Sequence, residues 1–422
     1  MQLRLALAVR TVALVAVASA AAIARPGLAR AQVGEFDTSH TVFYEAPTRT
    51  HMFVYSPSGD VQVSPFTWLD VRGGWEADVV SGASVATKAG GSYEATHGAD
   101  VITTASVHDF RNLARGEFTL KGDATTLTAG YAYSTEHDYH SNSIHASART
   151  DALQHNTQFE LAYARNFDKV CDRVQAATEA SSPARFIALE NSTGCFTDDP
   201  TRTSDSIDID TYEASWAQSW TPVLETQLTY TAQLLEGMQA DPYRSLVLGD
   251  GVKAQEHEPN QRAREAVTAK LAWYIRPIRA ALRLTVRGYW DTWAIKSGTV
   301  EAEFEKSLGE SLRVMARARV YDQSGAVFWS DDYTGGAPPL GPRGQYWTGD
   351  RELSPFWSWL VGARLVWTIA PTQGRLLGFL QTLKLGASAN MTTFDYLEYT
   401  LGGTPVSNAR AYLATLSLAA TF

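Results

Sequence analysis

Ionisable side chains recur at odd-numbered positions in three segments between residues 283 and 319, and this is the clearest pattern in the chain that could do chemistry. A period of two places such residues on one face of a β-strand. The pattern consists of Arg283, Arg287 and Asp291, then Glu301, Glu303 and Glu305, then Arg313, Arg317 and Arg319. Because an acidic segment lies between two basic ones, we expect cross-strand ion pairs or the electrostatic selection of a charged solute.

Residues that could hold a metal or act as catalysts are sparse. His137, His140 and His145 lie close together in the sequence, and His257 precedes Glu258. A zinc site needs three or four convergent ligands, whereas histidines in polar loops are more often solvated, so we expect no metal site. The chain contains no G-x-S-x-G, H-E-x-x-H or phosphate-loop motif, so we expect no enzyme activity and no cofactor.

The elements that must position the charges are long segments in which apolar and polar residues alternate. At the end of the chain the even positions carry Tyr412, Leu416 and Phe422, whereas the odd positions include Thr415 and Ser417. Alternation over ten or more residues is the length that a strand needs to cross a bilayer with tilt, and strands of soluble proteins are shorter. A final aromatic residue after such a strand resembles the signal read by the outer-membrane barrel assembly machinery, so we expect Phe422 to serve that recognition.

Short turns alternate with long connections along the chain, and the long ones lie near 167–206, 237–262, 325–355 and 394–407. Short periplasmic turns opposite long extracellular loops are typical of outer-membrane barrels. We therefore predict an all-β fold: a transmembrane antiparallel β-barrel of about 16 strands, with 14 as the alternative, in the cell outer membrane of a Gram-negative bacterium. The strands are predicted at 50–56, 60–80, 99–110, 113–121, 125–138, 142–151, 155–166, 207–220, 223–236, 263–276, 278–292, 296–306, 311–324, 356–370, 374–393 and 408–422. The Gly/Ser/Ala-rich segment 81–98 is too long for a periplasmic turn in this register.

Inside such a barrel the charged pattern has two interpretations. Charges that face lipid cost about 2–4 kcal/mol each at mid-membrane, so these side chains must face the lumen. They could form a selectivity lining for a charged permeant. They could instead form a charge zipper that fills the barrel and holds its shape, and because opposite charges weaken the field that a permeant feels, we favour the zipper. The zipper is expected to comprise Arg283, Glu301, Glu303, Glu305, Arg313 and Arg317.

The first residues have the pattern of an exported protein. The first ten contain two arginines and no acidic residue, residues 11–24 are small and apolar, and Ala29-Arg30-Ala31 fits the small-x-small rule for signal peptidase. We expect a cleaved signal peptide at 1–31 and a barrel over 32–422. An uncleaved membrane anchor is the alternative, but the apolar run is short for a span of roughly twenty residues.

The composition agrees with a barrel that has one apolar and one polar face. Aromatic residues make up 11% of the chain, yet the mean hydropathy is −0.19. The net charge of −9 excludes the basic footprint that nucleic-acid binding needs. The two cysteines, Cys171 and Cys195, lie in a polar segment, and in an oxidising compartment we expect them to form a structural disulfide rather than remain free thiols.

Five short stretches, in this order, resemble a family of outer-membrane barrels, number 3570 among the catalogued domains of unknown function. They are DVVSGAS (78–84), STEHDY (134–139), EPNQRAR (258–264), RGYWDTWAI (287–295) and RVYDQSGAVFW (319–329). The chain departs from the family pattern in two places. Pro259-Asn260-Gln261 stands where the family tends to have Pro-Asp, and Asp291-Thr292-Trp293-Ala294 stands where it tends to have Asp-Asp-Trp-Gly.

The resemblance implies an outer-membrane barrel and no particular reaction. Family members are thought to be encoded near small lipoproteins, thioredoxin-like proteins and flavin transferases, which suggests a link to extracytoplasmic redox chemistry. A periplasmic lipoprotein or redox protein is therefore an expected partner, beside outer-membrane lipid.

The predicted topology places four of these stretches at strand ends that face the long loops. We therefore predict a polar cluster at the outer mouth: Glu136, Asp138, Glu258, Arg262, Arg264, Arg287, Tyr289, Asp291, Arg319, Tyr321 and Gln323. One interpretation is a hydrogen-bonded network that braces the loops over the barrel. The other is a binding site for a small anion, a metal or a partner peptide.

Three functions remain compatible with the sequence, because one fold can host all of them. A porin-like channel or transporter for small solutes predicts conductance in planar bilayers. A structural barrel that anchors a periplasmic lipoprotein or redox partner predicts a closed lumen and co-purification of that partner. An outer-membrane enzyme, the hypothesis that we favour least, predicts turnover of esterase or protease substrates.

Overall fold

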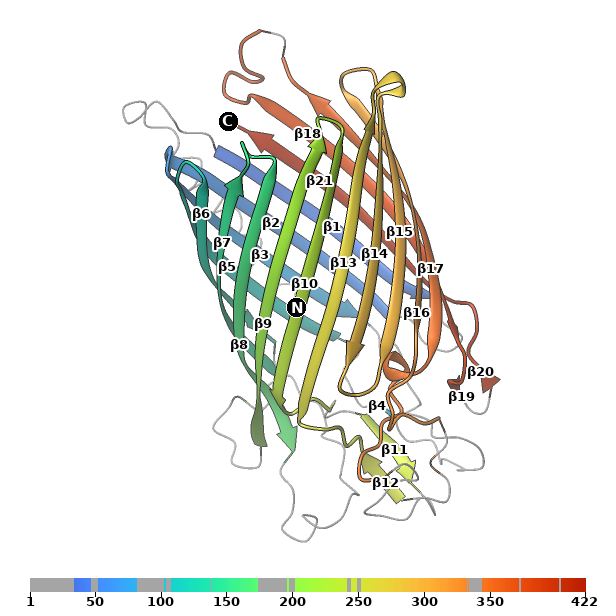
Figure 1. Ribbon diagram of the computed structural model, residues 1–422. Coiled ribbons are helices and arrows are strands. Elements are labelled where there is room, and N and C mark those ends of the chain that lie inside the picture. Colours follow the sequence, from blue (N-terminus) through green and yellow to red (C-terminus); the bar gives the residue numbers. More distant parts are fainter. Residues whose placement is uncertain are drawn as a thin grey trace.

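Sixteen strands close into one antiparallel barrel in the computed structural model (Figure 1). Each barrel strand pairs with the next one along the chain, and the first pairs with the last, from Glu35 opposite Thr421 to Ala46 opposite Arg410. The barrel strands are β1 (Gly34–Ala46), β2 (Met52–Phe66), β3 (Leu69–Ser81), β5 (His108–Lys121), β6 (Thr125–Thr135), β7 (Tyr139–Ala152), β8 (Thr157–Arg173), β9 (Arg202–Thr221), β10 (Leu224–Gly237), β13 (Gln261–Ile275), β14 (Ala280–Asp291), β15 (Lys296–Leu308), β16 (Leu312–Gln323), β17 (Phe356–Ile369), β18 (Thr382–Tyr396) and β21 (Ala409–Thr421). The predicted all-β barrel and its count of sixteen strands are confirmed.

The structure describes residues 34–46, 52–81, 102–103, 108–136, 138–173, 196, 202–240, 244–248, 252–331, 333, 344–371, 373–401 and 404–422. Outside the barrel, β4 (Ile102–Thr103), β11 (Arg244–Leu248) and β12 (Val252–Gln255) form a small sheet, and β19 (Thr400–Leu401) pairs with β20 (Thr404–Pro405). Two 3-10 helices are η1 (Arg276–Ile278) and η2 (Arg351–Leu353). Within these ranges no helix is long and apolar enough to cross a membrane. The predicted signal peptide at 1–31 lies outside them.

The two ends of the barrel differ in the length of their connections. At one end two residues join β2 to β3 and β9 to β10, and the chain ends there after β21. At the other end the connections run over 82–107, 174–201, 238–260 and 324–355. Figure 1 shows the sheet of β4, β11 and β12 at the lower end of the barrel. Short turns of outer-membrane barrels face the periplasm and long loops the outside, so on this pattern we assign the short-turn end to the periplasm and the long loops to the extracellular side.

Alternate side chains of each strand face opposite environments. On β14, β15 and β21 the exposed positions carry apolar side chains, such as Val286 (54% exposed), Val300 (57%) and Leu416 (64%). The charged residues of the same strands, including Arg283 and Glu301, occupy the alternate positions. Because an outward apolar band is the surface that meets lipid, the charged face lines the lumen. The fold and this band place the protein in the outer membrane.

The strand boundaries predicted for the first third of the chain are wrong. β1 was not predicted, since Thr38 and His40 interrupt its lipid-facing side. The segment predicted as one strand at 60–80 contains the turn between β2 and β3, and the two strands predicted at 99–110 and 113–121 are the single strand β5. Missing β1 lowers the predicted count by one and dividing β5 raises it by one, so the predicted total is still sixteen. With β1 in place, the long 82–107 connection falls at the extracellular end, where its length is ordinary.

One periplasmic connection is longer than predicted. A short turn was expected at Pro371-Thr372, with the next strand at 374–393, but β18 begins only at Thr382. The chain first makes a tight turn closed by a bridge between Leu376 and Leu380, with Leu377 and Gly378 at positive φ (53° and 85°). A left-handed pair of residues cannot continue an extended strand, so β18 starts after the turn.

Candidate lumen and outer-mouth site

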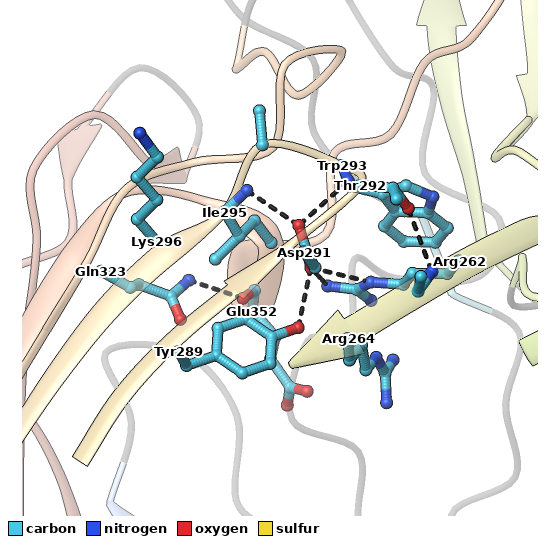
Figure 2. Close-up of polar contacts among 12 residues, drawn as sticks. Arg262, Arg264, Tyr289, Asp291, Thr292, Trp293, Ile295, Lys296, Gln323 and Glu352 are labelled. Atoms are coloured by element: carbon cyan, nitrogen blue, oxygen red, sulfur yellow. Dashed lines mark hydrogen bonds and ion pairs between the residues drawn. The ribbon is translucent and has the colours of Figure 1, made fainter. Parts of the chain in front are cut away.

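Asp291, the last residue of β14, is the acidic centre of the outer mouth (Figure 2). One carboxylate oxygen accepts hydrogen bonds from the Arg262 guanidinium, at 2.9 and 2.5 Å, and from the Tyr289 hydroxyl at 2.8 Å. The other accepts from the backbone N–H groups of Trp293 and Ile295, at 3.0 and 2.9 Å. The Asp291 side chain is 0% exposed and that of Arg262 is 7%. Because a buried ion pair is stable only when its remaining polar atoms are satisfied, these contacts have the form of a structural clamp.

Trp293 completes this group, which we call the mouth clamp (Arg262, Tyr289, Asp291 and Trp293). The Arg262 guanidinium lies 4.0 Å from the centre of the indole ring, and the indole N–H donates to the backbone oxygen of Gln261. A cation over the face of Trp is attracted by the ring quadrupole, most strongly where water is excluded. The clamp therefore ties the end of β13 to the turn between β14 and β15.

The turn after Asp291 accounts for both departures of the 287–295 stretch from the family pattern. The Thr292 hydroxyl accepts a hydrogen bond from the backbone N–H of Ala263 at 3.1 Å, so it supplies an acceptor where the family tends to have a second aspartate. Ala294 has φ +68°, in the left-handed region that glycine adopts without steric cost. The glycine of the family pattern therefore suits a positive-φ position, and this chain holds an alanine there under mild strain.

The extracellular loops over the mouth clamp pack into their own small core. Trp293 meets the ring of Phe328 edge-on, with centroids 5.2 Å apart, and its backbone oxygen accepts a hydrogen bond from the Val327 N–H at 2.9 Å. The buried members are Trp293, Ile295, Ala326, Phe328, Trp329, Leu353, Tyr396, Tyr399, Val406 and Ala409. This core joins the turn after β14 to the 324–355 loop and to the end of β18, so the loops over this side of the mouth are held in place.

The helix η2 extends from this core across the inner side of the mouth. Arg351 forms a two-pronged ion pair with Glu45 on β1, at 2.5 and 3.0 Å, and both side chains are largely buried. In the barrel order β18 and β21 lie between β1 and β17, the strand that follows η2, so this ion pair connects the segment before β17 to a strand three places away. Burial alone would lower the pKa of Arg351, but its hydrogen bonds to Glu45 and the nearby negative charges outweigh this and raise the pKa above the ordinary value. The arginine therefore stays charged at any pH at which the barrel is studied.

Tyr321 and Gln323 anchor the same loop from β16. The Tyr321 hydroxyl donates to the Gln323 side-chain oxygen at 2.5 Å. The Gln323 amide donates in turn to the backbone oxygens of Glu352 and Ser354, at 2.9 and 2.7 Å. Gln323 is buried, so its amide fixes the loop at the point where η2 enters the mouth.

The predicted outer-mouth cluster thus divides into separate groups. Arg262, Tyr289 and Asp291 meet in the mouth clamp, and Tyr321 and Gln323 hold the loop beside it. Glu136 instead lies 4.0 Å from Arg111 of β5, which also pairs with Asp78 of β3 at 2.6 Å. The backbone oxygen of Asp138 accepts from Cys171 N–H. Three strands separate β6 and β7 from β13 and β14, so these acids belong to another part of the wall. Glu258 is buried at the edge of the mouth, and the remaining members are Arg264, Arg287 and Arg319.

The structure brings together all six residues of the predicted charge zipper. Arg317 holds Glu301 at 2.6 Å, and Arg283 lies 3.6 Å from Glu305, while Arg313 reaches Glu305 at 3.5 Å. Glu303 lies 3.9 Å from both Arg283 and Arg317. Arg364 of β17, which was not predicted, also reaches Glu305 at 3.2 Å. Four arginines therefore share three glutamates.

Five further basic side chains on the same wall have no ion pair in the described part of the chain. By the alternation of the strands, the lumen-facing ones are Arg264 and Lys270 of β13, Arg287 of β14, Arg319 of β16 and Lys384 of β18. Arg264 donates to the Gln233 side-chain oxygen at 3.1 Å, and Arg287 lies 5.4 Å from the centre of the Tyr289 ring. We call the inner face of β13–β18 the basic wall. Its four described acids, Asp291, Glu301, Glu303 and Glu305, are all in ion pairs, so its net charge is positive.

The opposite holds on the inner face of β1–β10, which we call the acidic wall. Here four bases are bound by acids, Arg72 and Arg115 by Asp60, Arg111 by Asp78, and Lys121 by Asp70, whereas Arg149 of β7 has no ion pair among the described residues. The acids without an ion pair to Lys or Arg among the described residues include Asp37, Glu160, Glu213 and Glu225. The two walls meet around a lumen cavity of 410 Å³ near the periplasmic end, lined by Asp37 and Asp60 on one side and Arg313, Arg364 and Lys384 on the other.

The predicted histidine and cysteine sites fall only partly within the described residues. His145 bonds to Glu117 at 3.0 Å, His140 stacks on Phe196, and His257 bonds to the backbone oxygen of Gln345. In the described ranges no three metal-ligating side chains converge. Cys171 is buried near the end of β8, but Cys195 and His137 lie outside those ranges, so the disulfide stays a prediction.

Sequence reasoning missed the contacts that cross from loop to wall. Nothing in the alternation marks Arg351 or Glu45 as partners, since they lie 306 residues apart. Trp293 lies within one of the family stretches, and its position directly after Asp291 was a signal that could have found the mouth clamp. Arg364 lies on β17, next to the strands of the zipper, and the apolar residues on either side of it in the sequence indicated that its side chain faces the lumen.

Comparisons with known proteins found one matching family and several similar solved structures. The family described as a protein of unknown function (DUF3570) matches residues 4–380. No curated protein matches the sequence. Among solved structures, a bacterial polysaccharide outer membrane secretin is similar at TM-score 0.47 and 10% identity, over 92% of this chain and 97% of that one. OpdK of Pseudomonas aeruginosa with vanillate is similar at 0.42 and 7%, over 94% and 100%, and OccK11 (OpdR) of the same organism at 0.40 and 9%, over 94% and 99%. At such scores the similarity carries no inference about function.

Proposed function

The chain belongs to the DUF3570 family of proteins of unknown function, and from this premise and the chemistry of its lumen we propose that it is a porin-like channel for small polar solutes. The observation that carries the proposal is the inner wall of a closed sixteen-stranded barrel with charges that lack a partner. Barrels of sixteen to eighteen strands leave an aqueous channel, whereas those of about eight are filled by their own side chains.

The unpaired charges argue for water inside the barrel. An ion without a partner in a dry interior costs several kcal/mol, so Lys270, Arg287 and Arg319 on one wall and Glu160 and Glu213 on the other need solvent around them. If a charge zipper closed the lumen, we would expect its ion pairs to include these charges as well. The zipper of the structure covers only β14–β17, which leaves the rest of the inner wall to water.

The outer mouth supplies the narrow part of the proposed channel. The segment that carries η2 reaches from the loop core to Glu45 on β1, the strand three places from β17 in the barrel. The packing of Leu353 in the loop core and the Arg351–Glu45 ion pair hold η2 in this position. A fixed constriction passes small solutes and excludes large ones.

Single-channel recording of the refolded protein in planar bilayers tests the proposal. A channel gives discrete conductance steps, and the Arg351→Ala variant, with its constriction loosened, gives larger or noisier steps. A correctly folded barrel that stays silent contradicts the proposal and favours a structural barrel that anchors a periplasmic lipoprotein or redox protein. Co-purification of such a partner from solubilised outer membranes is the positive test of that alternative.

The recognition of Phe422 by the assembly machinery belongs to the same proposal. β21 closes the barrel against β1, the backbone N–H of Phe422 bonds to Gly34 at 2.9 Å, and its ring stacks against Phe379. The terminal strand is thus the last element needed for closure. Deletion of Phe422 is expected to lower the amount of barrel inserted in cells without preventing refolding in detergent, and equal insertion would overturn this role.

A further inference from the structure

Two neighbouring rows of the basic wall hold more positive charge than their acids can balance. The pairing of β13, β14, β15 and β16 sets Lys270, Thr285, Glu301 and Arg319 in one row, and Thr268, Arg287, Thr299 and Tyr321 in the next row toward the mouth. Glu301 is the only acid in either row, and it bonds to Arg317 of the row below at 2.6 and 3.0 Å. No acid in the two rows is therefore available to neutralise Lys270, Arg287 and Arg319.

The surroundings hold the two arginines on the wall. Arg287 lies over the ring of Tyr289, and the hydroxyl of that tyrosine is fixed by Asp291 in the mouth clamp. Tyr321 lies in the electrostatic range of both Arg287 and Arg319, and its own hydroxyl is occupied by Gln323. Tyr289 thus presents its ring face to Arg287, and neither tyrosine supplies an anionic partner.

Arg264 continues the positive surface toward the mouth. Its NH1 donates to Gln233, while its Nε is buried and has no hydrogen-bond partner. Figure 2 shows the Arg264 side chain pointing away from the Asp291 carboxylate that holds Arg262. A solute that enters from outside therefore passes Arg264 before it reaches the two rows.

We propose that Lys270, Arg287 and Arg319 form a binding site for small anionic solutes that carry a carboxylate or phosphate group. The proposal rests on the proposed channel and deepens it by naming the class of solute. Strands lie about 4.8 Å apart, so β14 and β16 are separated by ~10 Å, a gap that one small solute can bridge. The guanidinium fork matches the paired oxygens of a carboxylate or phosphate, and a lysine adds a point charge.

Reversal potentials in a potassium chloride gradient test the site in the intact barrel. The wild type is expected to prefer chloride over potassium. Since one unit charge ~7 Å away in water changes a local ion concentration about threefold, the double variant Arg287→Ala/Arg319→Ala is expected to lower the permeability ratio about fivefold. Arg287→Lys/Arg319→Lys keeps the charge and is expected to retain most of the ratio. The matched control is Lys306→Gln, which removes a positive charge from the lipid-facing side of β15.

Binding itself is measured with succinate and with inorganic phosphate as separate probes. Each is expected to block the chloride current, and the alanine double variant is expected to relieve the block, while the stronger blocker identifies the preferred group. Relief by Lys306→Gln to the same extent, or no block by either probe in a conducting barrel, overturns the site and leaves the channel standing. If the barrel is silent, calorimetric titration of the same probes decides: binding that the double variant abolishes upholds the site without the channel, and no binding overturns both.

Discussion

The two walls of the lumen differ in the sign of the charges that remain without an ion pair. On the acidic wall four bases are bound by acids and several acids remain without an ion pair; on the basic wall the four described acids are bound by bases and several bases remain. In each wall the minority charge that is in ion pairs is structural, because it holds part of the majority charge in place. The surplus faces the lumen and is available to a solute. Loss of a minority charge should therefore affect stability, and loss of a surplus charge should affect selectivity.

The largest expected effect is on stability and comes from Asp291, the most buried acid of the basic wall. Asp291→Ala leaves the buried Arg262 without a partner and removes the acceptor of two backbone N–H groups. We expect a loss of about 3–5 kcal/mol in the free energy of unfolding, measured by urea titration in detergent micelles. Glu213→Gln, a surplus acid of the other wall, is the control and should cost little. Equal losses from the two variants would remove the distinction between minority and surplus charges.

A smaller loss is expected where the loop from the basic wall meets β1. Arg351→Met leaves Glu45 without its ion pair at a largely buried position, and we expect a cost of about 2–3 kcal/mol together with easier proteolysis of the 324–355 loop. The double variant Glu45→Leu/Arg351→Met should recover part of the stability, since no unpaired charge remains. A double variant less stable than either single one would show that the ion pair is not the contact that matters.

The surplus acids should act on selectivity with the opposite sign to the surplus bases. Glu160→Gln/Glu213→Gln is expected to raise the preference for chloride about threefold, because it removes negative charge from the acidic wall. The change should shrink as salt rises, since the screening length falls from about 10 Å at 0.1 M to about 3 Å at 1 M. Reversal potentials at several salt concentrations measure both trends. An unchanged or lowered preference would mean that the two walls do not act separately on the permeating ion.

The smallest expected effect lies in the turn after the mouth clamp. Ala294→Gly relieves a left-handed alanine, which costs about 1 kcal/mol, but glycine gains freedom in the unfolded chain. We expect a net gain of roughly 0.5 kcal/mol in the same urea titration, with no change in selectivity. A loss of stability would show that the methyl group of Ala294 makes a contact that outweighs the strain.

The barrel could be predicted from the sequence because the interactions that determine it lie within one strand or between strands that are neighbours along the chain. Apolar residues at alternate positions of a long strand, such as Val286 and Val300, have only one environment that accepts them, and the charges between them must then face the lumen. The zipper followed from the same parity, since the paired strands are neighbours along the chain. The first strand was missed because polar residues such as His40 lie on its lipid-facing side, where the alternation is weak.

The outer mouth could be predicted only in part, because its contacts join distant segments. Arg262 and Asp291 were expected in one cluster, but that they are buried against Trp293 depends on a loop core that no periodicity describes. Glu136 was placed in the same cluster from its position at a strand end, yet the ring of strands sets it beside Arg111 on the other wall. The alternation along a strand predicts whether a side chain faces the lumen or the lipid, and its place along the strand predicts the end of the barrel. Neither predicts its position around the circumference of the barrel.

The reversal potential of the wild-type barrel in a potassium chloride gradient tests the central claim most directly. The account predicts open channels with a sign that shows preference for chloride, because the bases that remain free lie in the rows just inside the mouth clamp. A folded barrel that conducts potassium in preference to chloride, or that does not conduct at all, would contradict it.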